Sequence, residues 1–308
     1  MKLSFVIPCY RSEHTVSTVI QEIMTTMSAR PNLDFEVIAV NDSSPDNVWD
    51  VLKNLAENDK RIKAIDFSKN MGKGSAQLAG FKIANGDIVV SLDDDGQCPF
   101  DGIWRLLEPI ETGIADVSIA DFGYKHESAF RNFGSYLNGL MAEMLVGKPR
   151  GLKFSAFFAM KRFIVDEVIR YKHPFPYVLG LVLRATSKII NVPIKDRARL
   201  SGTSGYTMKK LIGLVLNGFT AFSVKPLRVA TFLGLLCSFT GVLYAILTII
   251  RKISHPEIMA GWSSIMSALL VIGGMILFVL GLIGEYVGRI YICINNSPQY
   301  VIRETINV

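Results

Sequence analysis

Residues 87–97 read DIVVSLDDDGQ, an apolar run that ends in three adjacent carboxylates and a glutamine. A short apolar run bounded by turn residues predicts a buried β-strand. Side chains alternate along an extended chain, so Asp93 and Asp95 point to one side and Asp94 to the other. Neighbouring carboxylates repel one another, and a divalent cation with oxygen ligands relieves that repulsion. The stretch therefore predicts a site for Mg²⁺ or Mn²⁺ at the end of a strand.

The surrounding chain alternates between strand and helix patterns. Apolar runs that predict strands occur at residues 3–7, 35–40, 62–67, 88–92 and 117–120. Helical patterns lie between and after them at residues 16–27, 48–57, 73–84 and 100–111. This order predicts an α/β fold with a mainly parallel sheet and helices on both faces. Its ligand site is expected beyond the carboxyl ends of the strands.

Polar residues follow four of the predicted strands. The first strand ends at Pro8 and Tyr10, the second at Asp42, and the third in a glycine-rich turn before Lys73. Each of these ends, taken alone, is also typical of a turn or a helix cap. The carboxyl ends of parallel strands meet at one edge of a sheet, so the four ends together with the carboxylates favour a shared crevice.

Composition excludes several classes of protein. The chain has 308 residues, of which 50% are hydrophobic, and its mean hydropathy is +0.32. These values argue against a purely soluble globular protein and against disorder. Four cysteines without a CxxC pair argue against a disulfide scaffold.

Charge is segregated along the chain. Residues 1–147 carry 13 basic and 21 acidic side chains, whereas residues 148–228 carry 16 basic and 3 acidic ones. The acidic part suits a cation site, and the basic block suits lipid headgroups or phosphates. A nucleic-acid partner is not expected, because no recognised nucleic-acid-binding motif accompanies the basic block.

Two apolar segments predict a membrane hairpin. Residues 229–250 are 22 residues without a charge, and residues 265–283 form a second span of 19. Lysine and arginine residues before the first span favour a globular part on the cytoplasmic side. The two spans are then expected in the inner (plasma) membrane. The expected organisation is a catalytic domain at 1–205, an interfacial amphipathic helix at 206–228, two transmembrane helices within 229–290 and a cytoplasmic tail at 291–308. The alternative for residues 206–222 is an amphipathic helix buried on the globular core.

The combined motifs resemble a known family. VIPCY, VNDSSPD, KNMGKG, DDDGQ, RNFGS and RLSGTSGY, followed by a membrane hairpin, resemble the polyprenyl-phosphate glycosyltransferases of glycosyltransferase family 2. That family includes dolichyl-phosphate mannose synthase and bacterial undecaprenyl-phosphate glucosyltransferases. The resemblance implies a GT-A fold, a nucleotide-sugar donor, a divalent metal, inversion at the sugar carbon and a polyprenyl-phosphate acceptor.

The resemblance also assigns roles to residues at matching positions. It implies a donor site formed by Pro8, Tyr10, Asp42, Lys73, Asp93 and Asp94. It implies metal and diphosphate binding by Asp93, Asp95 and Gln97. It implies an acceptor-phosphate site formed by Lys125, Arg131, Ser135, Arg199, Ser204 and Tyr206. The sequence departs from the family pattern twice, because Glu13 is displaced by one position and Ser43 replaces a glycine.

The chemistry of the acceptor is consistent with these roles. A phosphate monoester has a second pKa of about 6, so much of it is a dianion near neutral pH and needs no general base. Arg131 provides a bidentate grip on such a phosphate, and Asp93 or Asp95 faces the positive charge that develops on the sugar. We therefore expect Asp93, Asp95 and Arg131 to be catalytic. The alternatives are a surface charge for Arg131 and for Lys125, and a juxtamembrane anchor for Arg199 and Tyr206.

Two other functions are compatible with parts of the sequence. A processive polysaccharide synthase shares the fold but usually carries a QxxRW motif, and the sequence has no Arg-Trp pair. A non-catalytic nucleotide-sugar-binding module, or a subunit of a lipid-linked sugar transporter, is the alternative from another class. UDP-glucose is the leading donor by resemblance, and N-acetylglucosamine, galactose or a modified arabinose are alternatives to glucose. Five glycines between residues 273 and 288 favour close helix packing in a homo-oligomer, with a tetramer suggested by relatives.

Overall fold

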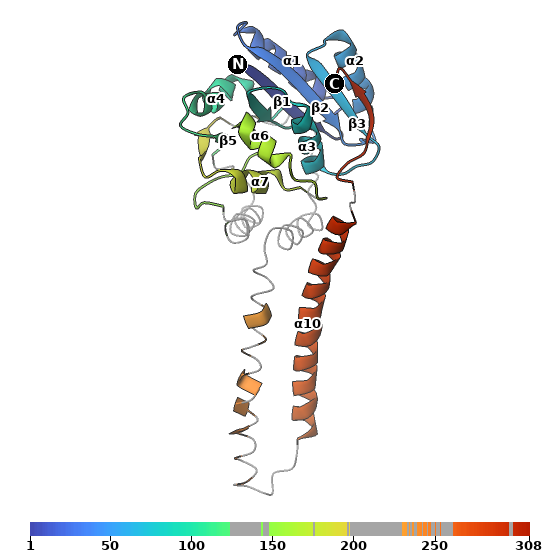
Figure 1. Cartoon of the computed structure of the whole chain (residues 1–308), viewed down its shortest axis with the longest axis vertical. Coiled ribbons are helices and arrows are strands. Elements are labelled where there is room, and N and C mark those ends of the chain that lie inside the picture. The colour runs from blue at the N-terminus through green and yellow to red at the C-terminus, as the bar shows by residue number, and fades with distance from the viewer. Residues whose placement is uncertain are drawn as a thin grey trace. The chain divides into compact units, whose positions relative to one another are not determined.

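The computed structural model describes residues 1–123, 143, 148–174, 176–195, 197, 261–295 and 298–308, with scattered positions between 230 and 253. They divide into two compact units, one of residues 1–208 with 296–308 and one of residues 209–295. The first unit contains an eight-stranded sheet in the order β7-β5-β6-β4-β1-β2-β3-β8 (Figure 1). The strands are β1 (Lys2–Cys9), β2 (Asp34–Asn41), β3 (Ile62–Phe67), β4 (Ile88–Ser91), β5 (Val117–Asp121), β6 (Phe158–Lys161), β7 (Ile189–Pro193) and β8 (Ile302–Ile306).

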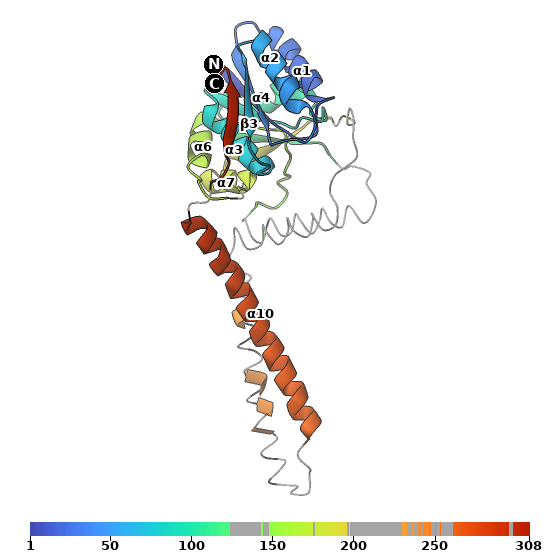
Figure 2. The ribbon, with the colours of Figure 1, turned by 90° about the vertical axis from the view of Figure 1, so that its right-hand side faces the viewer.

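Helices cover both faces of the sheet. One face carries α1 (Val16–Ser28), α2 (Val48–Asn58), the 3₁₀ turn η1 (Phe100–Gly102) and α4 (Ile103–Glu111). The other face carries α3 (Lys73–Ile83), α6 (Arg162–Val168) and α7 (Val178–Ala185), as the edge-on view in Figure 2 shows. Helix α1 buries Val16, Val19, Ile20, Ile23 and Met27, which lie on one face of a 3.6-residue helix. Helix α3 instead buries every residue from 75 to 81, so the helices pack on a central sheet that is covered on both faces.

The strand order places a topological switch point between β1 and β4. From β1 the chain proceeds through α1 to β2 and through α2 to β3, and then α3 crosses the opposite face to reach β4 on the other side of β1. In open α/β sheets, ligands bind outside the carboxyl ends of the strands at such a point. The loops after β1 and β4 therefore border the expected ligand site.

The predicted α/β fold is confirmed, and its sheet is mixed. All five strands predicted from the sequence are present, and β1 to β4 are parallel. Strand β6 is antiparallel to both β4 and β5, and β8 is antiparallel to β3. The predicted helix at 100–111 begins as the 3₁₀ turn η1 before α4.

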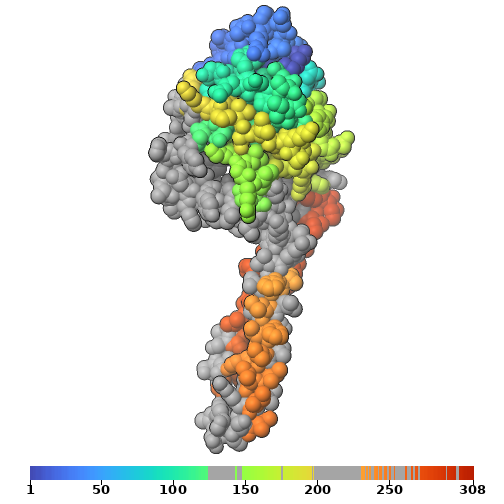
Figure 3. All heavy atoms as spheres, turned by 90° about the vertical axis from the view of Figure 1, so that its left-hand side faces the viewer, coloured from blue at the N-terminus to red at the C-terminus, as the bar shows by residue number. Residues whose placement is uncertain are grey.

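Strands β6 and β7, which follow β5 in the sequence, complete the half of the sheet that lies away from β8. Strand β7 pairs in parallel with β5, and the residues after it lie beside η1 and α4, yellow against teal in Figure 3. A Cβ on Gly102 would lie 2.7 Å from Cγ2 of Ile194, so this contact is close. The residue after β7 thus packs against the 3₁₀ turn that follows the acidic residues.

The expected tail at 291–308 has a different role in the structure. Residues 291–294 continue helix α10 (Trp262–Ile294), and residues 302–306 form β8 at the edge of the sheet, beside β3. The chain therefore returns to the first unit after α10 and adds a strand to it. A polar, exposed edge strand such as IRETI carries little apolar periodicity, which explains why the sequence does not predict it.

The second unit contains one described helix of membrane-spanning length. Among the described residues, Val271–Ile294 is the candidate span, with a mean hydropathy of 2.0 and none of it buried within the chain. Helix α10 is about 50 Å long at 1.5 Å per residue, so it exceeds the hydrocarbon thickness and extends past the expected span of 265–283. The first expected span, 229–250, and the expected interfacial helix fall mostly or wholly outside the described residues and stay predictions.

Candidate functional site

The loops after β1 and β4 are bonded to each other at the switch point. The backbone N–H of Tyr10 donates to Oδ2 of Asp94 at 2.9 Å. Arg11 has a φ of +57°, in the left-handed region, so the chain turns sharply away from β1. Burial raises the pKa of Asp94 to about 6, with a further upward contribution from the Asp93 charge. Asp94 therefore connects the loop after β4 to the loop after β1.

Asp93 faces the start of helix α3. Its carboxylate forms an ion pair with the Lys73 ammonium, and both side chains are partly exposed to the crevice. The next alternating carboxylate, Asp95, accepts the backbone N–H of Gln97 at 3.0 Å. The three acids thus make three different contacts, with the Lys73 ammonium, the Tyr10 amide and the Gln97 amide.

Asp42 holds the glycine-rich turn that leads into α3. Its carboxylate accepts the N–H groups of Met71 at 2.7 Å and Gly72 at 2.9 Å, and its carbonyl oxygen accepts the Asn70 amide at 3.0 Å. Asp42 is 3% exposed, and burial raises its pKa against the opposing effect of the two amides. Gly72 has a φ of +84°, which favours glycine. Asp42 therefore shapes the turn, in addition to its predicted contact with a nucleotide.

Further side chains join the loops after β1 and β2. Glu13 accepts the N–H of Asn47 at 2.9 Å, while Asp46 accepts the N–H of Glu13 at 3.1 Å. Ser44 accepts the N–H of Arg11 at 2.7 Å. Sequence spacing does not reveal these bonds, because they connect residues 33 or 34 positions apart. The displaced Glu13 thus has a structural partner in the second loop.

Tyr10 lies at the rim of the same crevice. The residue is 44% exposed, and the Arg11 guanidinium lies 5.5 Å from the ring centroid. Pro8 is buried two residues earlier in β1, where it pairs with Val40. The aromatic ring is thus fixed to a central strand and presents a face that suits a planar heterocycle.

The donor set of the crevice fits a hard cation. Asp93 and Asp95 offer carboxylate oxygens and Gln97 an amide oxygen, which are the ligand types that Mg²⁺ and Mn²⁺ prefer. In the ranges that the structure describes, no three His, Cys, Asp or Glu side chains are grouped to hold a metal by themselves. Two carboxylates with oxygen atoms from a phosphate make a suitable shell for such an ion.

Six predicted acceptor-site residues lie outside the described residues. They are Lys125, Arg131, Ser135, Arg199, Ser204 and Tyr206. The structure brings together the other predicted positions, from Pro8 to Gln97, at the carboxyl ends of β1, β2 and β4. The acceptor half of the predicted site stays a prediction.

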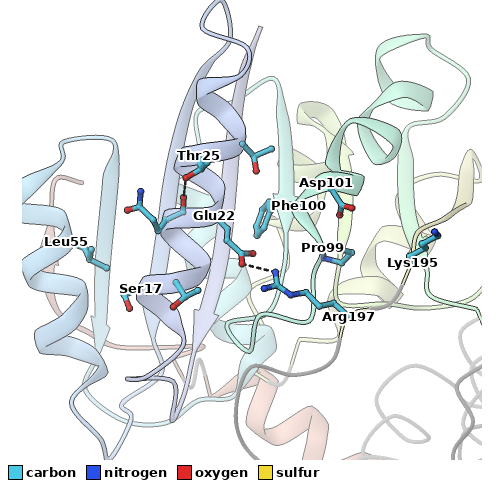
Figure 4. A pocket seen from close by; sticks show the side chains of 12 residues that line it. Ser17, Glu22, Thr25, Leu55, Pro99, Phe100, Asp101, Lys195 and Arg197 are labelled. Atoms are coloured by element: carbon cyan, nitrogen blue, oxygen red, sulfur yellow. Dashed lines mark hydrogen bonds and ion pairs between the residues drawn. The ribbon is translucent and has the colours of Figure 1, made fainter.

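A separate groove runs along helix α1. It has a volume of about 860 Å³, and its described lining includes hydroxyl groups of α1, Phe100 and the cations Lys195 and Arg197 (Figure 4). Arg197 donates to Glu22 across it at 2.7 Å. The described lining includes none of the predicted donor or metal residues, so the groove is not the candidate site.

Gly74 marks a close approach at the edge of the site, and its replacement tests the packing of α3. A Cβ at this position would overlap the carbonyl oxygen of Pro176, which is backbone and cannot rotate away. We expect Gly74→Ala to destabilise the protein by about 2 kcal/mol through overpacking. Thermal unfolding of the full chain in detergent measures this, with the exposed Lys82→Ala on the same helix as control. Equal unfolding temperatures for the two variants would contradict the described contact.

Two family models match this chain. The model described as glycosyl transferase family 2 matches residues 4–169, and the model described as the GtrB C-terminal hairpin matches residues 225–290.

Curated relatives match over nearly the full length. An uncharacterized glycosyltransferase, YkcC, of Bacillus subtilis is 31% identical and is covered to 95%, with all of this chain aligned. The SfII prophage-derived bactoprenol glucosyl transferase of Shigella flexneri is 29% identical, with 99% of this chain and 98% of the relative covered. An undecaprenyl-phosphate 4-deoxy-4-formamido-L-arabinose transferase of Photorhabdus laumondii is 30% identical, with 99% and 94% covered.

Solved structures share the fold of the first unit. Glucosyl-3-phosphoglycerate synthase from Mycobacterium tuberculosis, in complex with Mn²⁺, UDP and phosphoglyceric acid, has a TM-score of 0.53 at 18% identity. The match covers 71% of this chain and 76% of that one. At this identity the similarity shows a common GT-A-like α/β fold.

Proposed function

This chain belongs to glycosyl transferase family 2, and we propose that it transfers a hexose from a nucleoside-diphosphate sugar to a polyprenyl phosphate. The reaction forms a bond between an acceptor phosphate oxygen and the anomeric carbon, and releases the nucleoside diphosphate with inversion at that carbon. One observation carries the proposal: the Tyr10 loop, the turn held by Asp42 and the acidic residues 93–95 meet at one switch point.

These contacts support our assignment of the donor half of the site. Tyr10 offers an exposed ring for the base, and the turn held by Asp42 places the first turn of α3 beside the acidic residues. Lys73, at the start of that helix, contributes a positive charge near the donor diphosphate. The N-terminal N–H groups of α3 add a favourable dipole for the same anion.

The side-chain oxygen atoms near the end of β4 support the proposal of a metal site. We assign Asp95, Asp93 and Gln97 as the residues that hold Mg²⁺ or Mn²⁺. When bound, the ion supplies positive charge that stabilises the departing diphosphate. Asp93 and Asp95 also place negative charge where an oxocarbenium-like sugar forms.

The acceptor half is supported by the relatives. The similar Shigella protein is described as a bactoprenol glucosyl transferase and the Photorhabdus one as an undecaprenyl-phosphate transferase. By that similarity we assign acceptor-phosphate binding to Arg131 with Ser135 and Lys125, and to Arg199, Ser204 and Tyr206. An aligned phosphate dianion attacks without a general base, so the chain needs to position it rather than to deprotonate it.

The proposed donor is UDP-glucose. Glucose follows from the description of the Shigella relative, and the Photorhabdus relative makes a modified arabinose the first alternative. A panel of UDP and GDP sugars, screened by thermal shift with Mn²⁺, distinguishes these donors.

The membrane arrangement is a further part of the proposal. Helix α10 exposes apolar side chains along its length, and the hairpin model spans both expected membrane segments. We propose two spans in the inner membrane with the catalytic domain cytoplasmic. The glycines of α10 have open space at their Cβ positions, which suits close packing in a homo-oligomer such as a tetramer. Chemical cross-linking in native membranes tests this assembly.

Transfer of labelled sugar to lipid tests the function directly. The full chain in detergent is incubated with UDP-[¹⁴C]glucose, Mn²⁺ and undecaprenyl phosphate, and label is counted in the organic phase. We expect transfer that requires both the lipid phosphate and the metal. Donor binding without turnover of any sugar in the panel would instead establish a non-catalytic nucleotide-sugar-binding protein.

Replacing Tyr10 tests the base-binding assignment. Stacking of a base on an aromatic ring is worth about 1–3 kcal/mol, so Tyr10→Ala should weaken UDP binding by about tenfold. Tyr10→Phe keeps the ring and should bind UDP like the wild type. Isothermal titration with UDP and Mn²⁺ measures both variants. Unchanged affinity in Tyr10→Ala would remove Tyr10 from the donor site.

A further inference from the structure

Strand β8 pairs with β3 through an irregular register. Asp66 lies opposite Glu304 and Phe67 lies opposite Ile302, so Arg303 is the additional residue of a β-bulge. A bulge redirects the side chain of the additional residue. The Arg303 guanidinium reaches Oδ2 of Asp66 at 3.2 Å and the carbonyl oxygen of Ser68 at 3.1 Å.

Asp66 links Arg303 to the loop after β2 through hydrogen bonds. It is 1% exposed, and its second oxygen, Oδ1, accepts the amide of Asn41 at 2.8 Å. The side-chain oxygen of Asn41 accepts the N–H of Ser44 at 3.1 Å. The intervening Ser43 has a φ of +49°, a strained conformation that its neighbours must hold. The chain of bonds therefore ends at the loop that contains Asp42.

Ser68 links Arg303 to the glycine-rich turn, because its carbonyl oxygen accepts from the Arg303 guanidinium. Its N–H donates to the carbonyl oxygen of Val301 at 2.9 Å, so Val301 and Arg303 together hold both backbone groups of Ser68. The ring of Tyr300 stacks on Phe67 with a centroid distance of 5.1 Å and an angle of 4°. Ser68 begins the turn whose Met71 and Gly72 amides bind Asp42. Both loops of the proposed donor site thus depend on β8.

We propose that Arg303 is a positioning residue for nucleotide-sugar binding, acting through Asp66 and Ser68. The inference rests on the proposed function, because it takes these two loops as part of the donor site. A buried carboxylate needs a counter-charge, and Asp66 has one in Arg303. A planar guanidinium binds the carboxylate and the Ser68 carbonyl oxygen at the same time, which a lysine ammonium does less well.

A pair of neighbouring substitutions in β8 tests the proposal. Arg303→Ala removes the contacts to Asp66 and Ser68, whereas Glu304→Ala removes exposed contacts to Trp49 and Lys53 on α2. We expect Arg303→Ala to raise the donor KM about tenfold and leave the KM for lipid phosphate unchanged. Arg303→Lys should recover part of the loss. Glu304→Ala should change either KM by less than about twofold.

Hydrogen exchange separates this inference from the proposed function. In the protein without substrates, the amides of Ser44, Met71 and Gly72 should exchange faster in Arg303→Ala than in Glu304→Ala. Equal exchange, or equal donor KM values in the two variants, would overturn the role of Arg303. A wild-type protein that turns over no sugar would overturn the proposed function, while the exchange measurement would still decide whether Arg303 holds the loops.

Discussion

Replacing Asp95 with asparagine is expected to lower sugar transfer about a thousandfold while leaving the fold intact. The substitution keeps the size of the side chain and its ability to accept the Gln97 N–H, which Asp95 accepts at 3.0 Å. It removes the negative charge that we assign to metal binding and to the developing positive charge on the sugar. The loss should therefore appear in kcat, measured by transfer of label to undecaprenyl phosphate at saturating Mn²⁺.

A nearby aspartate provides the matched control. Asp101 lies six residues further along the chain in η1, is exposed, and lines the groove beside α1. Asp101→Asn makes the same chemical change outside the crevice and should leave kcat within about twofold of the wild type. Metal-dependent transfer by Asp95→Asn at the wild-type rate would contradict the assignment of the cation site.

Removing the carboxylate of Asp42 should impair both stability and donor binding. Asp42→Ala leaves the Met71 and Gly72 N–H groups without the acceptor that they share in the folded protein. Hydrogen bonds to a charged group contribute about 1.5–3 kcal/mol, so we expect a loss of about 3 kcal/mol in the free energy of unfolding. The released turn should raise the donor KM by at least about tenfold, because Lys73 follows it directly.

The other end of the same strand gives the control for Asp42. Asp34 begins β2, is exposed, and forms a surface ion pair with Lys2 at 3.6 Å. Asp34→Ala should cost less than about 1 kcal/mol and should leave the donor KM unchanged. If thermal unfolding and donor KM respond equally to Asp34→Ala and Asp42→Ala, then Asp42 does not organise the donor turn.

The first half of the fold is largely readable from the sequence. Strands β1 to β5 are apolar runs bounded by turn residues, because a sheet buried on both faces requires continuous apolar side chains. The positions of Tyr10, Asp42 and residues 93–95 follow directly, since the residue after a parallel strand must lie at the same edge as its neighbours. The alternation expected for residues 93–95 stays a prediction, because β4 ends at Ser91 and residues 94–96 form a bend.

Other features depend on contacts that have no local signal. The places of strands β6 and β7 in the sheet are set by partners far away in the sequence. Glu13, Asp46 and Ser44 bind backbone groups of another loop, so spacing within one segment does not reveal them. The role of Arg303 depends on a bulge, which exists only once β8 is paired with β3.

The position of β8 in the chain also affects how the protein is made. Chains fold from the N-terminus as they are synthesised, so β1 to β7 leave the ribosome before the apolar helix α10. Strand β8 emerges only after α10, and until then the edge of β3 and the buried Asp66 have no partner from β8. The contacts that β8 makes with β3 and Asp66 are therefore formed only after the apolar helix has been translated, and under our proposal newly made protein gains full donor affinity only after that point.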